Sequence, residues 1–286
     1  MNDRMRCVGV AGAMLVALSA TVSARADDTS PAASNDPVAD YFNRWFDRVD
    51  QVQAEQPHWA TPLATTTGRL TEQIRYDQLD AYLPNGAHEQ VYEDGKGIDF
   101  IPAENIGVMI GLPPYEARET VKPAQGWDDW PFFRLKYRLA SANETQGNYI
   151  VTALVQLGAP TGIDSFTSHA YTVTPALAVG KGWGDFDIQS IVSGTLPTAD
   201  VSANGRTLTW NTAFQYRLWG IFTPEVEFND TYWQGSARGG KNQLLLTVGA
   251  VVGRIKLVDR TSLTLGLGYQ FAVSPKAELV PVLVPT

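Results

Sequence analysis

The chain has 286 residues, including 25 glycines, 17 prolines, 8 tryptophans, 11 tyrosines and 11 phenylalanines, and only 18% of its residues are charged. This composition excludes a helical bundle and a disordered tail, and it favours a glycine-rich β protein. The formal net charge is −8, and without positions 1–26 the 22 basic and 30 acidic residues become 19 and 29. We therefore expect no nucleic-acid partner.

The first 26 residues have the pattern of a signal peptide. Arg4 and Arg6 precede an apolar run over 8–18, and small residues lead to an exit at Ala26. Such a segment is removed on export, so the sequence predicts a mature chain that starts next to Ala26 and leaves the cytoplasm.

An amphipathic helix is predicted over 37–55, after a polar leader that starts at residue 27. Its apolar residues recur at steps of three and four: Val38, Tyr41, Phe42, Trp45, Phe46, Val49 and Val52. One reading places the helix in a polar lumen as a plug, through Arg44 and Arg48. The other places it at the periplasmic mouth, with its aromatic stripe on the barrel rim or the lipid interface. The apolar stripe fits a polar lumen poorly, which favours the mouth. The first domain boundaries are thus 1–26 and 27–66.

The remaining residues, 67–286, change to a period of two. In 130–141 an apolar face alternates with the cations Arg134, Lys136 and Arg138, and 207–218 and 261–273 repeat the alternation. These segments have about a dozen residues and aromatic ends, as in the strands of outer-membrane barrels with an apolar outside and a polar lumen. A secreted lipocalin-like barrel would have the opposite arrangement. The sequence predicts an all-β fold, an antiparallel transmembrane β-barrel of about 12 strands.

Eleven strands can be placed from the alternation, and a twelfth is needed for an even number. They are expected near 70–82, 87–93, 98–112, 131–141, 148–158, 169–180, 184–196, 207–218, 222–234, 242–255 and 261–273. Short turns alternate with longer connections such as 113–130, and short turns belong on the periplasmic side. Only 276–286 remains for a descending twelfth strand, and its prolines weaken strand pairing.

Eight side chains are predicted to line the lumen: Arg134, Lys136, Arg138, Asn211, Gln215, Arg217, Glu225 and Glu227. Pairing Leu218 with Phe222 puts Gln215 opposite Glu225. The three cations of 134–138 either attract anions into an open path or form a buried network with Glu225, Glu227, Asp187 or Asp77. The network is slightly favoured.

Four runs of the sequence resemble a family of bacterial outer-membrane proteins. They are GKGIDFIPAENIGVMIGLPPY (95–115), FRLKYRLASANETQGNYIVTA (133–153), TVTPALAVGKGWGDFDIQS (172–190) and WNTAFQYRLWGIFTPEVEFNDTYWQG (210–235). The family is named for the meta-cleavage pathway of phenol degradation, and its members are often called transporters. The resemblance covers roughly 60–275 and implies a barrel that moves small aromatic or hydrophobic compounds. It also implies a last strand with an aromatic end, whereas this chain ends in AELVPVLVPT.

Catalytic and metal chemistry have weak support in the sequence. His58, His88 and His169 are the only histidines, and the only cysteine, Cys7, lies in the predicted signal peptide. Ser165 and Ser168 are near His169, but the immediate neighbour of a histidine in a strand points to the opposite face.

The acidic pairs 27–28 and 128–129 are expected to be solvated loop charges, and the GxGxG run 180–184 is expected to be a hairpin turn. We expect no cofactor, no metal and no enzyme. The predicted partners are outer-membrane lipid and a small hydrophobic or aromatic solute, and the predicted function is a channel, transporter or binding protein. The alternatives are a structural or adhesion barrel with a blocked lumen and an outer-membrane hydrolase.

Overall fold

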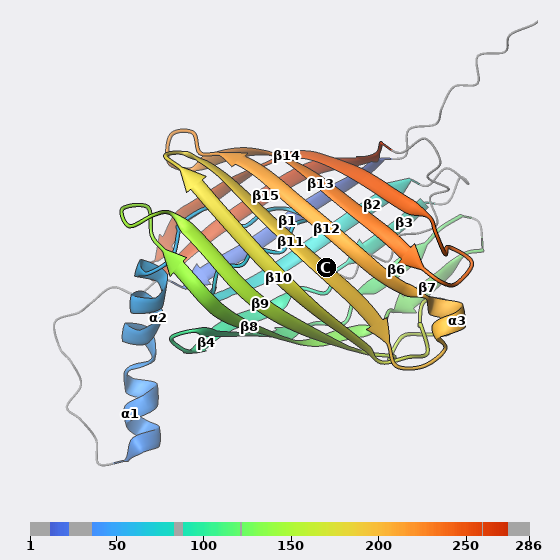
Figure 1. Cartoon of the computed structure of the whole chain (residues 1–286), viewed down its shortest axis with the longest axis horizontal. Coiled ribbons are helices and arrows are strands. Elements are labelled where there is room, and N and C mark those ends of the chain that lie inside the picture. Colours follow the sequence, from blue (N-terminus) through green and yellow to red (C-terminus); the bar gives the residue numbers. More distant parts are fainter. Residues whose placement is uncertain (1–11, 23–35, 83–87, 121, 259, 274–286) are drawn as a thin grey trace, which may run out of the picture.

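The fold was obtained from a computed structural model, which describes residues 12–22, 36–82, 88–120, 122–258 and 260–273. These residues form one antiparallel sheet that closes into a barrel (Figure 1). The strands in the described ranges are β1 Gly12–Val22, β2 Gln73–Tyr82, β3 His88–Tyr92, β4 Gly97–Ala103, β5 Ile106–Gly111, β6 Tyr115–Arg118, β7 Ala124–Trp127, β8 Trp130–Ala142, β9 Tyr149–Ala159, β10 Thr172–Trp183, β11 Phe186–Pro197, β12 Arg206–Tyr216, β13 Phe222–Gln234, β14 Asn242–Val258 and β15 Thr261–Ala272.

Within the described residues the chain runs along the barrel from one end to the other twelve times. Three of these passes are interrupted and consist of two strands each. β3 and β4 both pair antiparallel with β2, β6 pairs with β3 as β5 pairs with β4, and β7 pairs with β6 as β8 pairs with β5. The breaks at 93–96, 112–114 and 128–129 are bridged by backbone hydrogen bonds, such as that from Leu112 N to Lys96 O at 2.8 Å. The wall therefore continues across them.

These interruptions correct two predictions. The expected single strand 98–112 is a hairpin, β4 and β5, which turns at Glu104 and Asn105. The expected long loop 113–130 contains β6, β7 and the start of β8. Breaks of two to four residues interrupt the period-two pattern, so the sequence suggests one strand where there are two, and a loop where there are short strands. The other predicted strands from 70–82 to 261–273 correspond to strands of the structure.

The two ends of the barrel differ, and they are called here the helix end and the loop end. The helix end carries α1 Pro37–Asn43 and α2 Trp45–Ala54, which lie outside the barrel (Figure 1), and its turns include 143–148, 184–185 and 217–221. The loop end has the longer connections 160–171, 198–205 and 235–241, and the short helix α3 Val201–Asn204. The expected alternation of turn lengths over residues 142–260 is confirmed.

The predicted helix is present with a break at Arg44. Asp36 caps α1, because its carboxylate accepts a hydrogen bond from Val38 N at 2.9 Å. In α2 the apolar stripe buries Val49 and Val52 against Leu70 and Ile101. The position at a mouth of the barrel, favoured over a plug, is confirmed.

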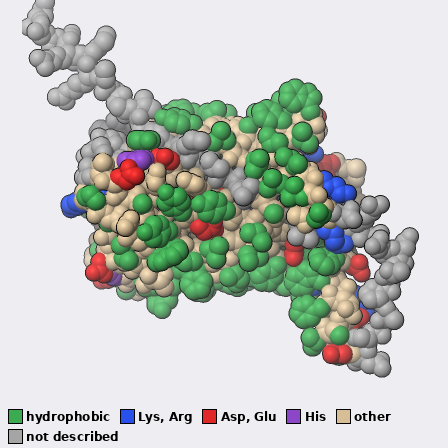
Figure 2. Space-filling view, turned by 180° about the vertical axis from the view of Figure 1, so that it is seen from behind, with side chains coloured by type: hydrophobic (Ala, Val, Ile, Leu, Met, Phe, Trp, Pro, Cys, Tyr) green, Lys and Arg blue, Asp and Glu red, His purple; other side chains and the backbone are tan. Residues whose placement is uncertain are grey.

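The barrel wall has two chemically different faces. Large apolar side chains point outward and stay exposed, whereas charged and amide side chains on alternate positions are buried inside. Figure 2 shows the apolar side chains spread over the middle of the barrel, with charged side chains mainly toward its ends. The outward set includes Ile74, Tyr76, Tyr137, Leu139, Leu177, Val179, Val192, Leu208, Trp210, Val226, Phe228, Val248, Leu265, Leu267 and Tyr269. The predicted alternation of faces is confirmed.

β1 closes the ring, pairing antiparallel with both β15 and β2. It consists of residues 12–22, inside the segment predicted to be a signal peptide. Removal of residues 1–26 would leave β15 and β2 with unpaired edges facing each other. The expected twelfth strand after Lys276 lies outside the described residues.

Candidate functional site

The lumen contains an internal segment, residues 56–72, which joins α2 to β2. It enters beside β9 and β10, where Trp59 lies over Gly180 and Gly182. A Cβ atom at Gly180 would come within 2.5 Å of the Trp59 ring, so these positions must remain glycine to admit it. The segment then crosses to β14 and β15, where Leu63 lies against Gly249 and Gly268. Glycines of the barrel wall thus leave the space into which Trp59 and Leu63 of this segment pack.

The packing of Trp59 against Gly180 and Gly182 corrects the expectation that the GxGxG run 180–184 is a hairpin turn. Only Gly184, with φ +61°, lies in the hairpin turn between β10 and β11. Gly180 and Gly182 are within β10 and provide room for Trp59. No helix follows the run, which is consistent with the rejection of a phosphate loop.

Two glutamates of β13 hold the middle of the internal segment. Glu225 accepts a hydrogen bond from Leu63 N at 2.9 Å, and Glu227 accepts bonds from Ala64 N at 2.8 Å and Thr65 N at 2.6 Å. Backbone N–H groups in a non-helical segment need such partners when buried. The carboxylates therefore replace the water that this backbone would otherwise bind.

Basic residues of the wall hold the carbonyl groups of the same segment. Lys136 Nζ donates to Thr67 O and Arg69 O, both at 3.1 Å. Arg75 donates to Leu63 O at 2.7 Å and to both carboxylate oxygens of Asp77. The segment is thus fixed from both sides by charged groups, and it fills the lumen between them.

All eight predicted lumen residues lie on the inner face of the barrel: Arg134, Lys136, Arg138, Asn211, Gln215, Glu225 and Glu227 are buried, and Arg217 is half-buried. The pairing across the Trp219 corner is confirmed, with Leu218 opposite Phe222 and Gln215 opposite Glu225. Whether these residues contact a solute stays a prediction.

The acidic partners expected for Lys136 and Arg138 are wrong. Arg134 donates to Gln156 Oε1, and Lys136 binds the carbonyls of the internal segment. Arg138 reaches the end of α2, donating to Val52 O at 3.1 Å and to the Glu55 carboxylate at 2.9 Å. Glu225, Glu227, Asp187 and Asp77 were expected in these roles. They are bound elsewhere because the internal segment, which the strand pattern does not predict, lies between the opposite walls.

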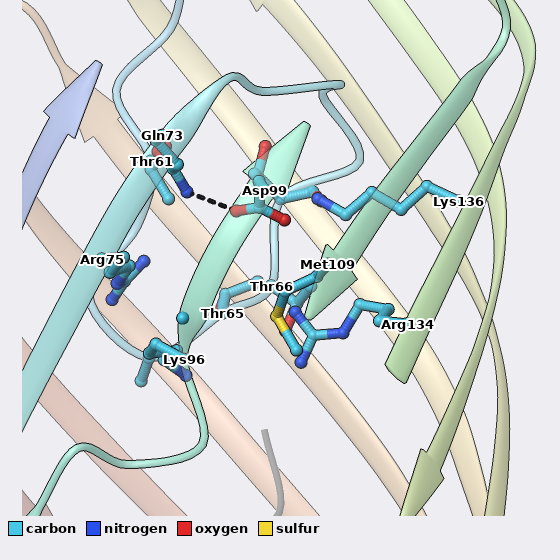
Figure 3. Close-up of a pocket in the computed structure, with 13 residues that line it drawn as sticks. Thr61, Thr65, Thr66, Gln73, Arg75, Lys96, Asp99, Met109, Arg134 and Lys136 are labelled. Atoms are coloured by element: carbon cyan, nitrogen blue, oxygen red, sulfur yellow. Dashed lines mark hydrogen bonds between the residues drawn. The ribbon is translucent and has the colours of Figure 1, made fainter. Parts of the chain in front are cut away.

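Two cavities lie along the internal segment. The loop-side cavity has a volume of about 30 Å³, room for about one water molecule, and the helix-side cavity about 70 Å³. Figure 3 shows the loop-side cavity, with Arg134 and Lys136 entering from one wall and Arg75 and Lys96 from the other. The helix-side cavity is lined by Arg69, Arg217 and Arg254, with His58 and Trp59.

Thr61 and Gln73 line both cavities. The sequence analysis identified Arg134, Lys136 and Arg217 among the lining residues and missed those of the internal segment. The run TPLATTTGRL, residues 61–70, has no helical or strand period, and its small and hydroxyl side chains were the available signal.

The histidines do not form a nucleophile-activating group within the described residues. The Ser168 hydroxyl donates to Asp129 and Ala170 O rather than to His169. His88 lies at the loop end between Asp80 at 2.6 Å and Glu119 at 2.9 Å, so its ring nitrogens contact carboxylates and no hydroxyl nucleophile.

The acidic pair 128–129 is not solvated, in contrast to the prediction. Asp128 is buried, and Asp129 accepts hydrogen bonds from Gly162 N and Ser168 N. The pair 27–28 lies outside the described residues. In the described part of the chain, His, Cys, Asp and Glu side chains form no group of three suited to a metal ion. No helix there is long and apolar enough to cross a membrane.

Comparisons with known proteins find similarity among solved structures. No family model matches the chain, and no curated protein matches it. The crystal structure of the COG4313 outer membrane channel from Pseudomonas putida F1 is similar over 96% of this chain and 99% of that chain, with a TM-score of 0.41 and 11% sequence identity. At this level of similarity neither fold nor function is drawn from the match.

Proposed function

We propose that this chain is a bacterial outer-membrane β-barrel through which small molecules pass or in which they bind. The observation that carries the proposal is the pair of opposite faces of the barrel wall, with apolar side chains outside and buried charged and amide side chains inside. In hydrocarbon every backbone polar group must be paired within the protein, and a closed barrel meets this requirement.

The exposed aromatic residues support the same location. They include Tyr149, Trp183, Tyr216 and Trp219 toward the helix end, and Tyr82, Trp127, Tyr171 and Tyr232 toward the loop end. Aromatic girdles of this kind mark the two interfaces of a membrane barrel. Because short turns face the periplasm in such barrels, we expect the helix end in the periplasm and the loop end outside the cell. The predicted signal peptide is consistent with export.

The family resemblance supports small hydrophobic or aromatic compounds as the solutes. No cofactor is required for passive movement through a lumen. The function as a channel requires that solutes can pass the internal segment, beside which the structure has two small cavities.

A second function, a structural or adhesion barrel with a blocked lumen, is favoured by that same segment. Its backbone is fixed to both walls by Glu225, Glu227, Lys136 and Arg75. Single-channel recording in a planar bilayer separates the two functions. Discrete current steps from protein purified from membranes support the channel, and their absence from a folded barrel supports the structural function.

A further inference from the structure

The first helix, α1, carries an apolar surface that the barrel does not cover. None of the seven residues of α1 is buried, and Val38 and Phe42 are each 62% exposed. The two lie on the same side of the helix, because residues four apart are neighbours on a helix surface. Figure 1 shows α1 projecting beyond the outline of the barrel wall, with its axis across the long axis of the barrel. Val38 and Phe42 thus stay open beside the barrel.

The apolar stripe predicted over 37–55 is divided between two surroundings. In α2, Val49 and Val52 are buried at the rim of the barrel. Where the helices meet, the Tyr41 hydroxyl donates a hydrogen bond to Pro102 O at 2.9 Å, near the end of β4. The rim therefore accounts for the part of the stripe in α2 and leaves the part in α1 exposed.

The exposed side of α1 is continuous with the outer face of the wall. On β4, Ile98 is exposed on the outside, and Phe100 points the same way because it follows two residues later in the strand. The rings of Phe100 and Trp45 lie 6.3 Å apart between centroids, and Trp45 stacks on Phe42 at 6.3 Å. Figure 2 shows hydrophobic side chains extending from the wall onto the projecting helices. One apolar surface thus runs from the wall to α1.

The rest of the α1 surface is polar, and its charges are paired. Asp40 forms an ion pair at 2.6 Å with Arg44, and Asn43 is exposed. At roughly 100° per residue, these side chains are turned away from the apolar pair. Residues 27–35, DDTSPAASN, are polar or small and have no large apolar side chain to cover Phe42. A helix with one apolar and one polar side, lying across the barrel axis, has the form of an interfacial helix.

We infer that α1 lies in the bilayer interface at the helix end, with Val38 and Phe42 inserted among the lipids and the ion pair of Asp40 and Arg44 toward water. Membrane lipid is the occupant because the apolar surface of α1 continues that of the wall. The inference rests on the proposed membrane location of the barrel and extends it to a part of the chain outside the wall. Lipid then holds α1 and α2 at a fixed depth, next to the entry of the internal segment.

The test is the depth of single nitroxide labels in protein reconstituted into phosphatidylcholine vesicles. Cys7 is the only cysteine of the chain, so Cys7→Ser gives a cysteine-free background. Labels are attached in it at Val38→Cys, Phe42→Cys and Asn43→Cys. Accessibility is measured to oxygen, which concentrates in lipid, and to a water-soluble nickel chelate. The ratio of oxygen to nickel accessibility should be several-fold higher at 38 and 42 than at 43, the matched control in the same helix. A label at Leu265→Cys reports on the outer face of β15.

The Leu265 label separates the possible failures. Water-accessible labels at 38 and 42, with the Leu265 label in lipid, would overturn the inference and leave the membrane barrel intact. Labels at 38 and 42 shielded from both reagents would mean that protein covers them, such as a second copy of the chain, and would also overturn it. A Leu265 label open to the nickel chelate would overturn the membrane location itself, together with this inference. Because α1 has no buried residue, each labelled variant should keep the heat-modifiable gel mobility of a folded barrel.

Discussion

Glu144, in the turn between β8 and β9, holds His58, the third residue of the internal segment. Its Oε1 accepts a hydrogen bond from His58 N at 2.7 Å, and its Oε2 lies 3.0 Å from the ring Nδ1. Both residues are partly exposed at the helix end. The pair fixes the point at which the internal segment enters the lumen.

This contact predicts a response to acid. Partial burial opposes the charge of Glu144, but the hydrogen bonds from the ring and backbone of His58 outweigh it and lower the pKa of that carboxyl. Such a group stabilises the folded contact above its unfolded pKa, and this stability is lost as the pH falls through the lower folded pKa. As the pH falls below the unfolded-state pKa of a glutamate, about 4.3, the entry of the segment should loosen progressively, and single-channel conductance should rise.

Glu144→Gln should remove this acid response. The control is Glu104→Gln, an exposed carboxylate in another turn at the helix end. If both variants keep the same dependence of conductance on pH as the wild type, the His58 contact does not control the segment.

The close packing of Leu63 against Gly268 leads to a prediction about stability. A Cβ atom at Gly268 would lie 2.7 Å from Leu63 Cδ1, so Gly268→Ala should destabilise the barrel by about 1–3 kcal/mol through overpacking. Leu63→Ala in the same chain should recover most of the loss. The measurement is urea unfolding of the two single variants and the double variant. Additive effects would mean that the two residues do not touch.

The two faces of the wall predict that an arginine destabilises the barrel more at an outward position than at an inward one. Leu265 is exposed on the outside of β15, so Leu265→Arg should cost about 2–4 kcal/mol if it lies near the bilayer midplane. Asn211 points into the lumen, and Asn211→Arg should be much milder. Thr152 also faces inward but is unsuitable as a control, because its hydroxyl donates to Gly68 O of the internal segment. Similar losses at Leu265 and Asn211 in unfolding from lipid vesicles would refute the assignment of faces.

The faces, most strands and the helix at the mouth could be predicted from the sequence, because each depends on a local period. Gln215 could be placed opposite Glu225 because a short turn determines the register. The breaks beside Lys96 and Asp128 could not be predicted, since they depend on hydrogen bonds between strands distant in sequence. The internal segment was missed for the same reason: Trp59 and Leu63 are held by glycines more than 100 residues away.

The position of β1 between β15 and β2 leads to a prediction about removal of the signal peptide. If the signal peptide is removed after Ala26, β1 is lost, and the edges of β15 and β2 require another antiparallel strand. β15 ends at Ala272 at the loop end, so a strand that follows it and pairs antiparallel with it would run in the direction that β1 has. We expect 276–286 to supply that strand. Intact mass of the protein from outer membranes should then correspond to 27–286.

Deletion of 276–286 should prevent stable assembly, measured by heat-modifiable gel mobility. Truncation after Val273 removes the same residues together with 274–275 and should behave alike. A mature protein that retains residues 1–26, or full stability without 276–286, would contradict this account and leave β1 as the closing strand.

The central claim is that the internal segment controls passage through an open-ended barrel. It is tested most directly by the single-channel conductance of the wild type and of a variant in which residues 60–67 are replaced by a Gly-Ser sequence of the same length. The account predicts small discrete openings in the wild type and several-fold larger ones in the variant. Equal conductance in two folded barrels, or no current from either, would contradict it.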